Sequence, residues 1–493
     1  MKPVLTLCLC GAITLFASNI NTSAAAEPAS LRYVDGSGCS ISPTEFSTWF
    51  APATLESGTS VSGTPQPGIP EKNGLVTFAD SVGFPSNNSK CDFYKWAQQM
   101  FLWIVSPDAG SIVLDSPTFY DVNFNSSGNA VYLANPPGSS NNSFALRGTK
   151  RENFQPGGQA GGNDTLLSLQ GSLVYFGVHA NDVYAWFNTA VSNGVLADTT
   201  PFPTTQDELN PIVQYAASQG AVLSDANALT LELKTAWVDA ATVTDPGDYV
   251  TIQAAVPNYV KTSDTLWTIS SSAPTINKTL ALVGMHVVGP VKGHPEMVWA
   301  SFEHHNNAPD NTFYFNTIFG QVPVPFDSSG DWNFMSNGGT QSGALIAQMT
   351  VDGSSGDITA TSGNAIRAND VYRVNPWGNA PTKASAANNS ELISLNLDIG
   401  LMLGLLDDVR ANYFQLGAVW TSNGTIPSSP GDAALVGSLL LANSTMETYH
   451  QQGTGDENQG CFGCHNATTS TGTSHLFSIS NVPLVPAAAN TRR

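Results

Sequence analysis

The sequence predicts an α+β fold, with a β-rich body and packed helices over residues 27–385 and a helical C-terminal region over 386–493. The clearest evidence for strands is a pair of apolar, β-branched or aromatic runs at 280–288 and 297–302. A turn containing Gly and Pro joins them at 289–295, as in a β-hairpin. Residues 111–147 resemble short strands separated by Asn, Ser and Gly turns, which adds to the β-rich character of the body.

Helical periodicity is the signal that separates the C-terminal region from the body. Leucines recur at helical spacing over 391–411, where Gly400 and Gly404 would permit close packing against a neighbour. Asp432, two residues after Pro430, is expected to cap a final helix running toward His450. The other expected elements are a helix capped by Asp92, a strand over 173–178, a short helix from Asn181 to Phe187, a helix over 211–218 capped by Asn210, and a strand over 229–237.

The chain is strongly acidic although few of its residues are charged. Of 493 residues, 38 are acidic and 18 are Lys or Arg, which gives a formal net charge of −20. A negative surface argues against nucleic acid and anionic membrane as partners and favours basic partners, or solubility alone. Because 41% of residues are hydrophobic, the composition indicates a globular chain rather than a disordered one.

The N-terminus has the pattern of a signal peptide. Lys2 precedes an apolar run over 4–16, and small residues at 24–26 form a cleavage site, so we expect cleavage near Ala26. The apolar run is too short to span a bilayer, and no later stretch is continuously apolar over a spanning length. The sequence therefore predicts a periplasmic or secreted protein without a membrane span.

Two of the cysteines outside this leader, Cys39 and Cys91, have no motif of their own. In an oxidising compartment they are expected to form one disulfide, worth roughly 3–4 kcal/mol in the chain-entropy model. The alternative is that Cys91, at the start of the helix capped by Asp92, is a reactive thiol of low pKa.

The pentapeptide Cys461-Phe462-Gly463-Cys464-His465 matches C-x-x-C-H, the attachment sequence of a c-type haem. Both thiols would bond covalently to a single haem c, and His465 would be the proximal ligand of its iron. A redox C-x-x-C or half of a zinc site is the alternative interpretation. No second C-x-x-C or H-x-x-x-H is present to complete a zinc site.

A distal haem ligand is harder to predict. Only 28 residues follow His465 and none is methionine, so a distal ligand lies upstream, is His475, or is absent. Met446 and His450 would share one face of the expected final helix, and a fold-back of the attachment loop would bring either to the iron. His286 is the third upstream candidate.

A second group of polar residues surrounds the predicted hairpin. Alternation places His304 on the strand face of Val298, Ala300 and Phe302, and places Glu303 on the other face. Buried histidines bonded to carboxylates are the expected outcome here, and a distal haem ligand, an acid/base pair or a second metal site are the alternatives. The group comprises His286, His294, Glu296, Glu303, His304 and His305.

Several segments of the second half resemble a group of exported bacterial proteins that carry one C-terminal C-x-x-C-H motif. The resemblance implies an exported c-type-cytochrome-like protein and no particular reaction. Only the haem-attachment residues carry a chemical role over to this chain. The matching segments are 231–237, 284–286, 297–304, 443–449 and 461–465.

Three classes of function follow from these observations. The leading hypothesis is electron transfer with a redox partner protein or a small-molecule donor or acceptor. The second is a haem-dependent oxidoreductase of the peroxidase or oxygenase type, with His304 and Glu303, or His286, as distal acid/base. The third is a surface- or polymer-binding protein in which haem is structural or sensory.

Overall fold

The computed structural model has an α+β fold rich in strands, as the sequence predicts. None of its described helices is both long and apolar enough to cross a membrane. The predicted signal peptide lies outside the described residues. The structure describes residues 31, 34–35, 38–51, 68–108, 110–125, 127–134, 142–143, 162–452, 460–480 and 484.

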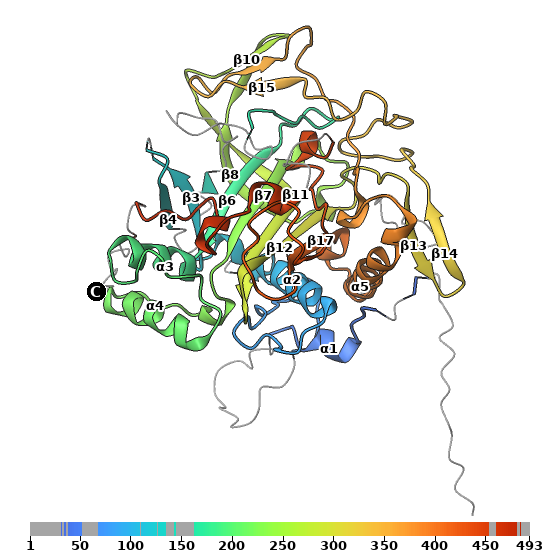
Figure 1. The fold of residues 1–493 in the computed structure, drawn as a ribbon. Coiled ribbons are helices and arrows are strands. Elements are labelled where there is room, and N and C mark those ends of the chain that lie inside the picture. Colours follow the sequence, from blue (N-terminus) through green and yellow to red (C-terminus); the bar gives the residue numbers. More distant parts are fainter. Residues whose placement is uncertain are drawn as a thin grey trace, which may run out of the picture.

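A ten-stranded sheet organises the molecule, and its main path runs β18-β17-β12-β11-β7-β6-β3-β4 (Figure 1). Every pairing along this path is antiparallel, and β8 and β5 extend the sheet from β11. The strands are β3 (Phe119–Phe124), β4 (Ala130–Ala134), β5 (Asn142–Ser143), β6 (Tyr175–Asn181), β7 (Glu232–Asp239), β8 (Thr251–Pro257), β11 (Thr275–Val291), β12 (His294–His304), β17 (Tyr413–Thr421) and β18 (Leu435–Gly437).

Smaller sheets and the helices surround this large sheet. The small sheets are β1 (Pro107–Asp108) with β2 (Ser111–Ile112); β13 (Phe313–Thr317) with β14 (Gly320–Val324); and β9 (Tyr259–Ser263), β10 (Leu266–Ile269), β16 (Ile358–Ala360) and β15 (Met349–Val351). The helices are α1 (Pro43–Ser47), α2 (Lys90–Ile104), α3 (Asp182–Ser192), α4 (Gln206–Ser218), α5 (Ala386–Leu405) and α6 (Cys461–Cys464).

The predicted hairpin forms the centre of the sheet. Strands β11 and β12 pair antiparallel, with Gly284 opposite Glu303 and Val288 opposite Trp299. The turn is tighter than expected, because β12 already begins at His294 and Gly293 takes the positive φ of 81° that the reversal requires. The hairpin is therefore confirmed, with longer strands than the apolar runs alone indicated.

Helices α2 and α5 cover one face of the sheet and lie next to each other (Figure 1). Phe101 of α2 stacks on Phe302 of β12 with ring centroids 4.4 Å apart, and Phe93 stacks on Trp420 of β17 at 4.2 Å. Val298, Ala300 and Phe302 belong to this apolar cluster, as the predicted alternation requires. The opposite face carries α3, α4 and the last described segment of the chain.

Helices α2 and α4 begin a few residues earlier than the sequence predicts, because other residues cap them. Ser89, not Asp92, caps α2, and Asp92 completes a capping box by accepting from the backbone of Ser89. Thr205 caps α4 with Glu208 in the same way, so the helix starts before Asn210 and contains Pro211 in its first turns.

The expected final helix is wrong. Residues 432–450 form turns, the strand β18 and a single 3-10 turn at Thr448–His450. Their backbone bonds to distant partners instead, with Ser438 N donating to Ala418 O and Leu440 N to Gly378 O, each at 2.8 Å. Among the described residues after 386, only α5 and α6 are α-helices, and β17 is an inner strand of the large sheet.

Two further expectations concern single positions. Gly400 and Gly404 do not mark a close approach, because a Cβ at either would have no atom within 4 Å. Cys39 and Cys91 form the predicted disulfide and tie the first described segment to α2. That pairing excludes the reactive-thiol alternative for Cys91 and is typical of proteins from oxidising compartments.

Candidate functional site

The floor of the candidate site is the sheet face opposite α2 and α5. In register across three strands, Lys234 of β7 lies beside His286 of β11, and His286 lies beside Ser301 of β12. Side chains of directly paired residues point to the same face and lie within contact range of each other. These three residues therefore form a polar row across the middle of the sheet.

An adjacent row runs parallel to the first, two residues along each strand. Glu232 of β7 pairs with Val288 of β11, which pairs with Trp299 of β12. Phe462 packs on this row, with its ring centroid 5.8 Å from that of Trp299. The C-x-x-C-H turn thus rests on strands that lie more than 150 residues earlier in the sequence.

The turn itself presents its two thiols differently. Cys461 is half-buried between two apolar clusters, whereas Cys464 is exposed. Neither is joined in a disulfide. Burial and the nearby Glu447 carboxylate raise the pKa of the Cys461 thiol well above its ordinary value. A reactive redox cysteine needs the opposite shift, so the surroundings of Cys461 disfavour that alternative.

The imidazole of His465 is fixed in orientation and in tautomer. Its Nδ1 lies 2.8 Å from the carbonyl oxygen of Thr473. A carbonyl only accepts, so Nδ1 carries the proton and the lone pair of the neutral ring lies on Nε2. Trp299 and His475 contact the ring, each with centroids 4.1 Å away. Burial and His475 lower the pKa of His465 to about 3, which keeps the ring neutral.

These features fit a covalently attached haem. A c-type haem requires two thiols on one short turn and a neutral imidazole that can bind the iron. The turn supplies both thiols, and the Nε2 of His465 carries the lone pair, because Nδ1 donates to Thr473. Metal-bound histidines almost always donate their other ring N–H to a carbonyl or a carboxylate, and His465 donates its own to Thr473. Cys461, Cys464 and His465 would hold the group.

A histidine–carboxylate pair lies beside the attachment turn. Nε2 of His286 is 3.0 Å and 3.1 Å from the two oxygens of Glu447. Lys234 Nζ is 3.7 Å from the same carboxylate, and the backbone N–H of Asn443 donates to it at 2.9 Å. Burial alone would raise the pKa of Glu447, but His286 and Lys234 lower it to about 2. Both His286 and Glu447 interact electrostatically with His465.

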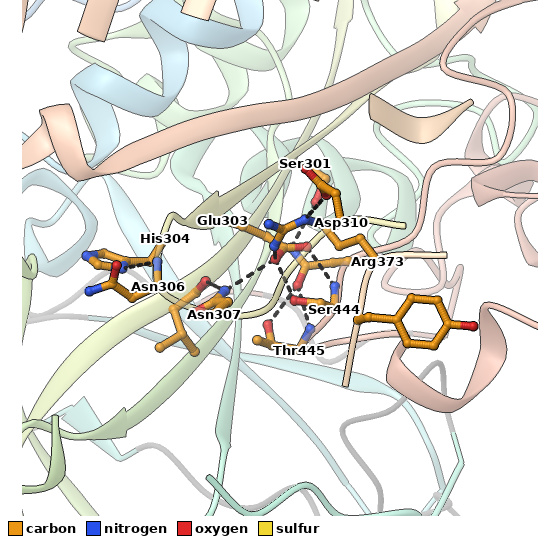
Figure 2. Close-up of polar contacts among 12 residues, drawn as sticks. Ser301, Glu303, His304, Asn306, Asn307, Asp310, Arg373, Ser444 and Thr445 are labelled. Carbon is orange, nitrogen blue, oxygen red and sulfur yellow. Dashed lines mark hydrogen bonds and ion pairs between the residues drawn. The ribbon is translucent and has the colours of Figure 1, made fainter. Parts of the chain in front are cut away.

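A buried ion-pair network holds the segment that carries Glu447 against the sheet (Figure 2). Glu303 of β12 pairs with Arg373 at 3.0 Å, and Arg373 also pairs with Asp310 at 2.6 Å. The same Glu303 carboxylate accepts from the backbone N–H of Ser444 at 2.7 Å and from its hydroxyl. Asn443 donates to Ser301 Oγ at 3.0 Å, which binds the segment to the polar row.

The structure separates the three distal-ligand candidates. Met446 is fully buried in an apolar cluster with Phe176 and Ala236, whereas Cys461 packs against two other clusters. His450 interacts electrostatically with Asp164. Without the final helix, Met446 and His450 no longer share a helix face, and His286 is the candidate in electrostatic contact with His465.

His475 also has a definite place. Its ring stacks on the ring of His465 with 25° between their planes. His475 therefore lies alongside the imidazole that would be the proximal ligand of a haem.

The remaining histidines of the predicted hairpin group do not converge on one site. His294 Nδ1 bonds to Glu296 at 2.9 Å, which is the expected buried histidine–carboxylate pair. His304 stacks on Tyr249, and its two ring nitrogens bond to the Asp248 carbonyl and the Asn306 N–H. Burial lowers the pKa of His304 to about 3, so it is ill suited as an acid/base. His305 stacks on Phe414, and Glu303 belongs to the ion-pair network.

A buried carboxyl that the sequence pattern did not predict lies next to the C-x-x-C-H turn. Glu232 accepts a hydrogen bond from Ser474, whose hydroxyl oxygen also lies 2.7 Å from that of Tyr184. Alternation along the buried strand could have indicated it, because Glu232 and Lys234 are charged residues of the same parity. Glu447 had no such signal, since nothing local predicts its pairing with a residue 161 positions away.

No group of three or more His, Cys, Asp or Glu side chains placed to hold a metal ion occurs in the described part of the chain.

Neither a family model, nor a curated protein, nor a solved structure matches this chain. The functional interpretation therefore depends on the geometry of the site itself.

Proposed function

We propose that this chain is an exported monohaem c-type protein that transfers electrons, with its haem attached through Cys461 and Cys464 and ligated by His465. The observation that carries the proposal is the fixed imidazole of His465, whose Nδ1–H is donated to Thr473. The haem would supply a one-electron redox couple. The leader pattern and the Cys39–Cys91 disulfide support an oxidising compartment outside the cytoplasm.

Different residues of the site would hold the haem and expose it to a partner. Trp299 and His475 hold the imidazole, and Cys464 lies at the surface, where an attached group comes within reach of a redox partner. The acidic composition favours a partner with a basic docking surface, and its association would weaken as salt rises.

The test is production of the full chain in a host that attaches haem, followed by intact-mass measurement and visible spectra of oxidised and reduced protein. We expect the mass of one covalent haem in the native protein and its loss in the Cys461→Ser, Cys464→Ser double variant. His450→Ala is the matched control and should retain the haem. Native protein without the added mass would overturn the proposal.

A haem-dependent oxidoreductase acting on peroxide or dioxygen is the second candidate. It is favoured by the pairing of His286 with Glu447 beside the attachment turn. When the His286 ring is neutral and donates Nε2–H to the carboxylate, the lone pair that a general base needs lies on Nδ1. Peroxide turnover that is lost in His286→Ala but kept in His450→Ala, at equal haem content, would support it. A six-coordinate, low-spin spectrum with no turnover would leave electron transfer as the function.

A further inference from the structure

Glu232 is a buried carboxyl whose surroundings do not compensate its charge. It is 7% exposed on an inner strand of the sheet. Among the described residues, its protonation is influenced by burial and by the hydrogen bond from Ser474, and no cation offsets the burial. Burial raises its pKa to about 7, so the group is placed to exchange a proton near neutrality.

The hydrogen bonds around Glu232 accommodate either protonation state. When the carboxylate is ionised, Ser474 donates to it and Tyr184 donates to Ser474, which also accepts from the backbone N–H of Leu476. When the carboxyl is protonated, both hydroxyl bonds can reverse without moving a heavy atom, because each hydroxyl is both a donor and an acceptor. A proton can therefore enter or leave without a rearrangement of the fold.

The same segment connects this carboxyl to the proximal histidine. Ser474 lies between Thr473, whose carbonyl holds His465 Nδ1, and His475, whose ring stacks on His465. Across the sheet, Glu232 is two strands from Trp299, which is about 10 Å at the usual strand spacing. Charge at Glu232 and charge at an iron bound by His465 are therefore close enough to influence each other.

We propose that Glu232 is a redox-linked proton site, whose carboxyl gains protons from solvent when the group held by Cys461, Cys464 and His465 accepts one electron. When the partner then oxidises the group, the electron passes to the partner and the carboxyl releases protons to solvent. The cause is electrostatic, since a reduced iron carries one positive charge fewer and stabilises the nearby carboxylate less. At an effective dielectric constant near 20, the proton affinity would change about tenfold between the two redox states. The inference rests on the proposed function.

Other titratable groups face the same region and define the controls. From α3, Tyr184 has a pKa raised well above its ordinary value and stays neutral. Lys234 lies on the same strand face, with His286 and Glu447 beyond it. His475 lies in the segment above. Asp182 at the start of α3 is a second buried carboxyl, whose pKa burial raises to about 7, but its charged neighbour is Asp225.

The experiment measures the midpoint potential of the haem-loaded full-length protein from pH 5 to pH 9. For the native protein we expect the potential to fall as pH rises through neutrality, with about half a proton taken up per electron at the steepest point, as a tenfold change in proton affinity allows. Glu232→Gln keeps the volume and the hydrogen bond to Ser474, and it should flatten the profile in that window. Asp182→Asn is the matched control and should retain the slope. A Glu232→Gln profile that keeps the native slope overturns the inference.

Two further measurements keep the inference open to refutation if Glu232→Gln does not accumulate. The Ser474 hydrogen bond lowers the pKa of Glu232, so Ser474→Ala should move the window to higher pH. In the native protein, reduction in weakly buffered solution near pH 7 should remove protons from the medium, and no uptake counts against the site. A chain without covalent haem overturns both proposals, whereas a haem-loaded native protein with a flat profile overturns only this one.

Discussion

At the scale of single residues, Trp299 has the most direct effect on how His465 is held. Its ring contacts both His465 and Phe462, and its Nε1–H donates to the Glu296 carbonyl at 3.1 Å. Trp299→Ala should lower the free energy of unfolding by about 3–5 kcal/mol, as expected for a large buried aromatic side chain. Trp299→Phe, which keeps a ring, should cost less. Urea unfolding of both variants measures the difference, and equal losses would contradict a packing role for the ring.

Glu232 also predicts a pH dependence of stability that needs no haem. Its pKa is about 7 in the folded protein against an ordinary value of 4.5, so the folded state binds the proton more tightly. Stability from this group is therefore fully present below pH 4.5 and is lost as pH rises to 7. The loss is roughly 2–4 kcal/mol.

Urea unfolding at pH 5 and pH 8 tests this dependence in the native protein and in Glu232→Gln. The variant should lose less stability over that interval than the native protein does. Asp182 contributes a change of the same sign in both proteins, so the difference between them isolates Glu232. If the native protein and Glu232→Gln lost the same stability between pH 5 and pH 8, burial would not raise the pKa of Glu232.

At the scale of elements, residues 443–447 can approach β11 closely because position 284 is a glycine. A Cβ on Gly284 would lie 2.6 Å from Thr445 Oγ1 and 3.0 Å from Asn443 Oδ1. Gly284→Ala should therefore displace the segment, lower the melting temperature and weaken the His286–Glu447 pair. Gly400→Ala in α5 meets nothing within 4 Å and should be neutral, or stabilising by up to about 1 kcal/mol. Thermal unfolding of both variants is the measurement.

The buried ion pair between Glu303 and Arg373 anchors the same segment. Glu303→Ala leaves the Arg373 guanidinium with Asp310 alone and removes the acceptor of Ser444, so we expect a loss of about 3 kcal/mol. Lys261→Ala removes an exposed pair with Asp264 and should change stability little. A Glu303→Ala protein as stable as Lys261→Ala would contradict the anchoring role.

The elements that sequence alone predicted are those whose local pattern agrees with their tertiary environment. The central hairpin was predictable because both strands are apolar and meet at a Gly-containing turn. The final helix was wrong because backbone groups of residues 438–440 bond to Gly378 and Ala418. Tertiary hydrogen bonds of this kind override a weak helical preference.

The site divides in the same way. The C-x-x-C-H turn is a local pattern and was legible in the sequence, and so was the pairing of Cys39 with Cys91. The partners of the turn were not, because Trp299, Thr473 and Glu447 reach it only through sheet register and chain reversal. Which carboxylate meets His286 is decided by long-range packing, for which a single sequence gives no local signal.

At the scale of the whole molecule, the disulfide connects the N-terminal segment to the helix that supports the sheet. Cys39 and Cys91 are 52 positions apart, so the crosslink restricts a large loop in the unfolded chain. Cys39→Ser, Cys91→Ser should lower the free energy of unfolding by about 4 kcal/mol in the chain-entropy model. Urea unfolding measures this, with haem content unchanged as the control. Equal stability before and after reduction of the native disulfide would contradict it.

The seating of the attachment turn on the sheet also constrains biogenesis. Cys461 is packed between apolar clusters and Phe462 is 1% exposed, so docking of the tail restricts access to the Cys461 sulfur, although Cys464 stays exposed. On the proposed function, attachment to Cys461 would therefore precede docking, and the tail would dock on the sheet with its cofactor already bound. Haem attachment would then be coupled to the last step of folding. Variants whose tail docks before attachment should accumulate as protein without haem.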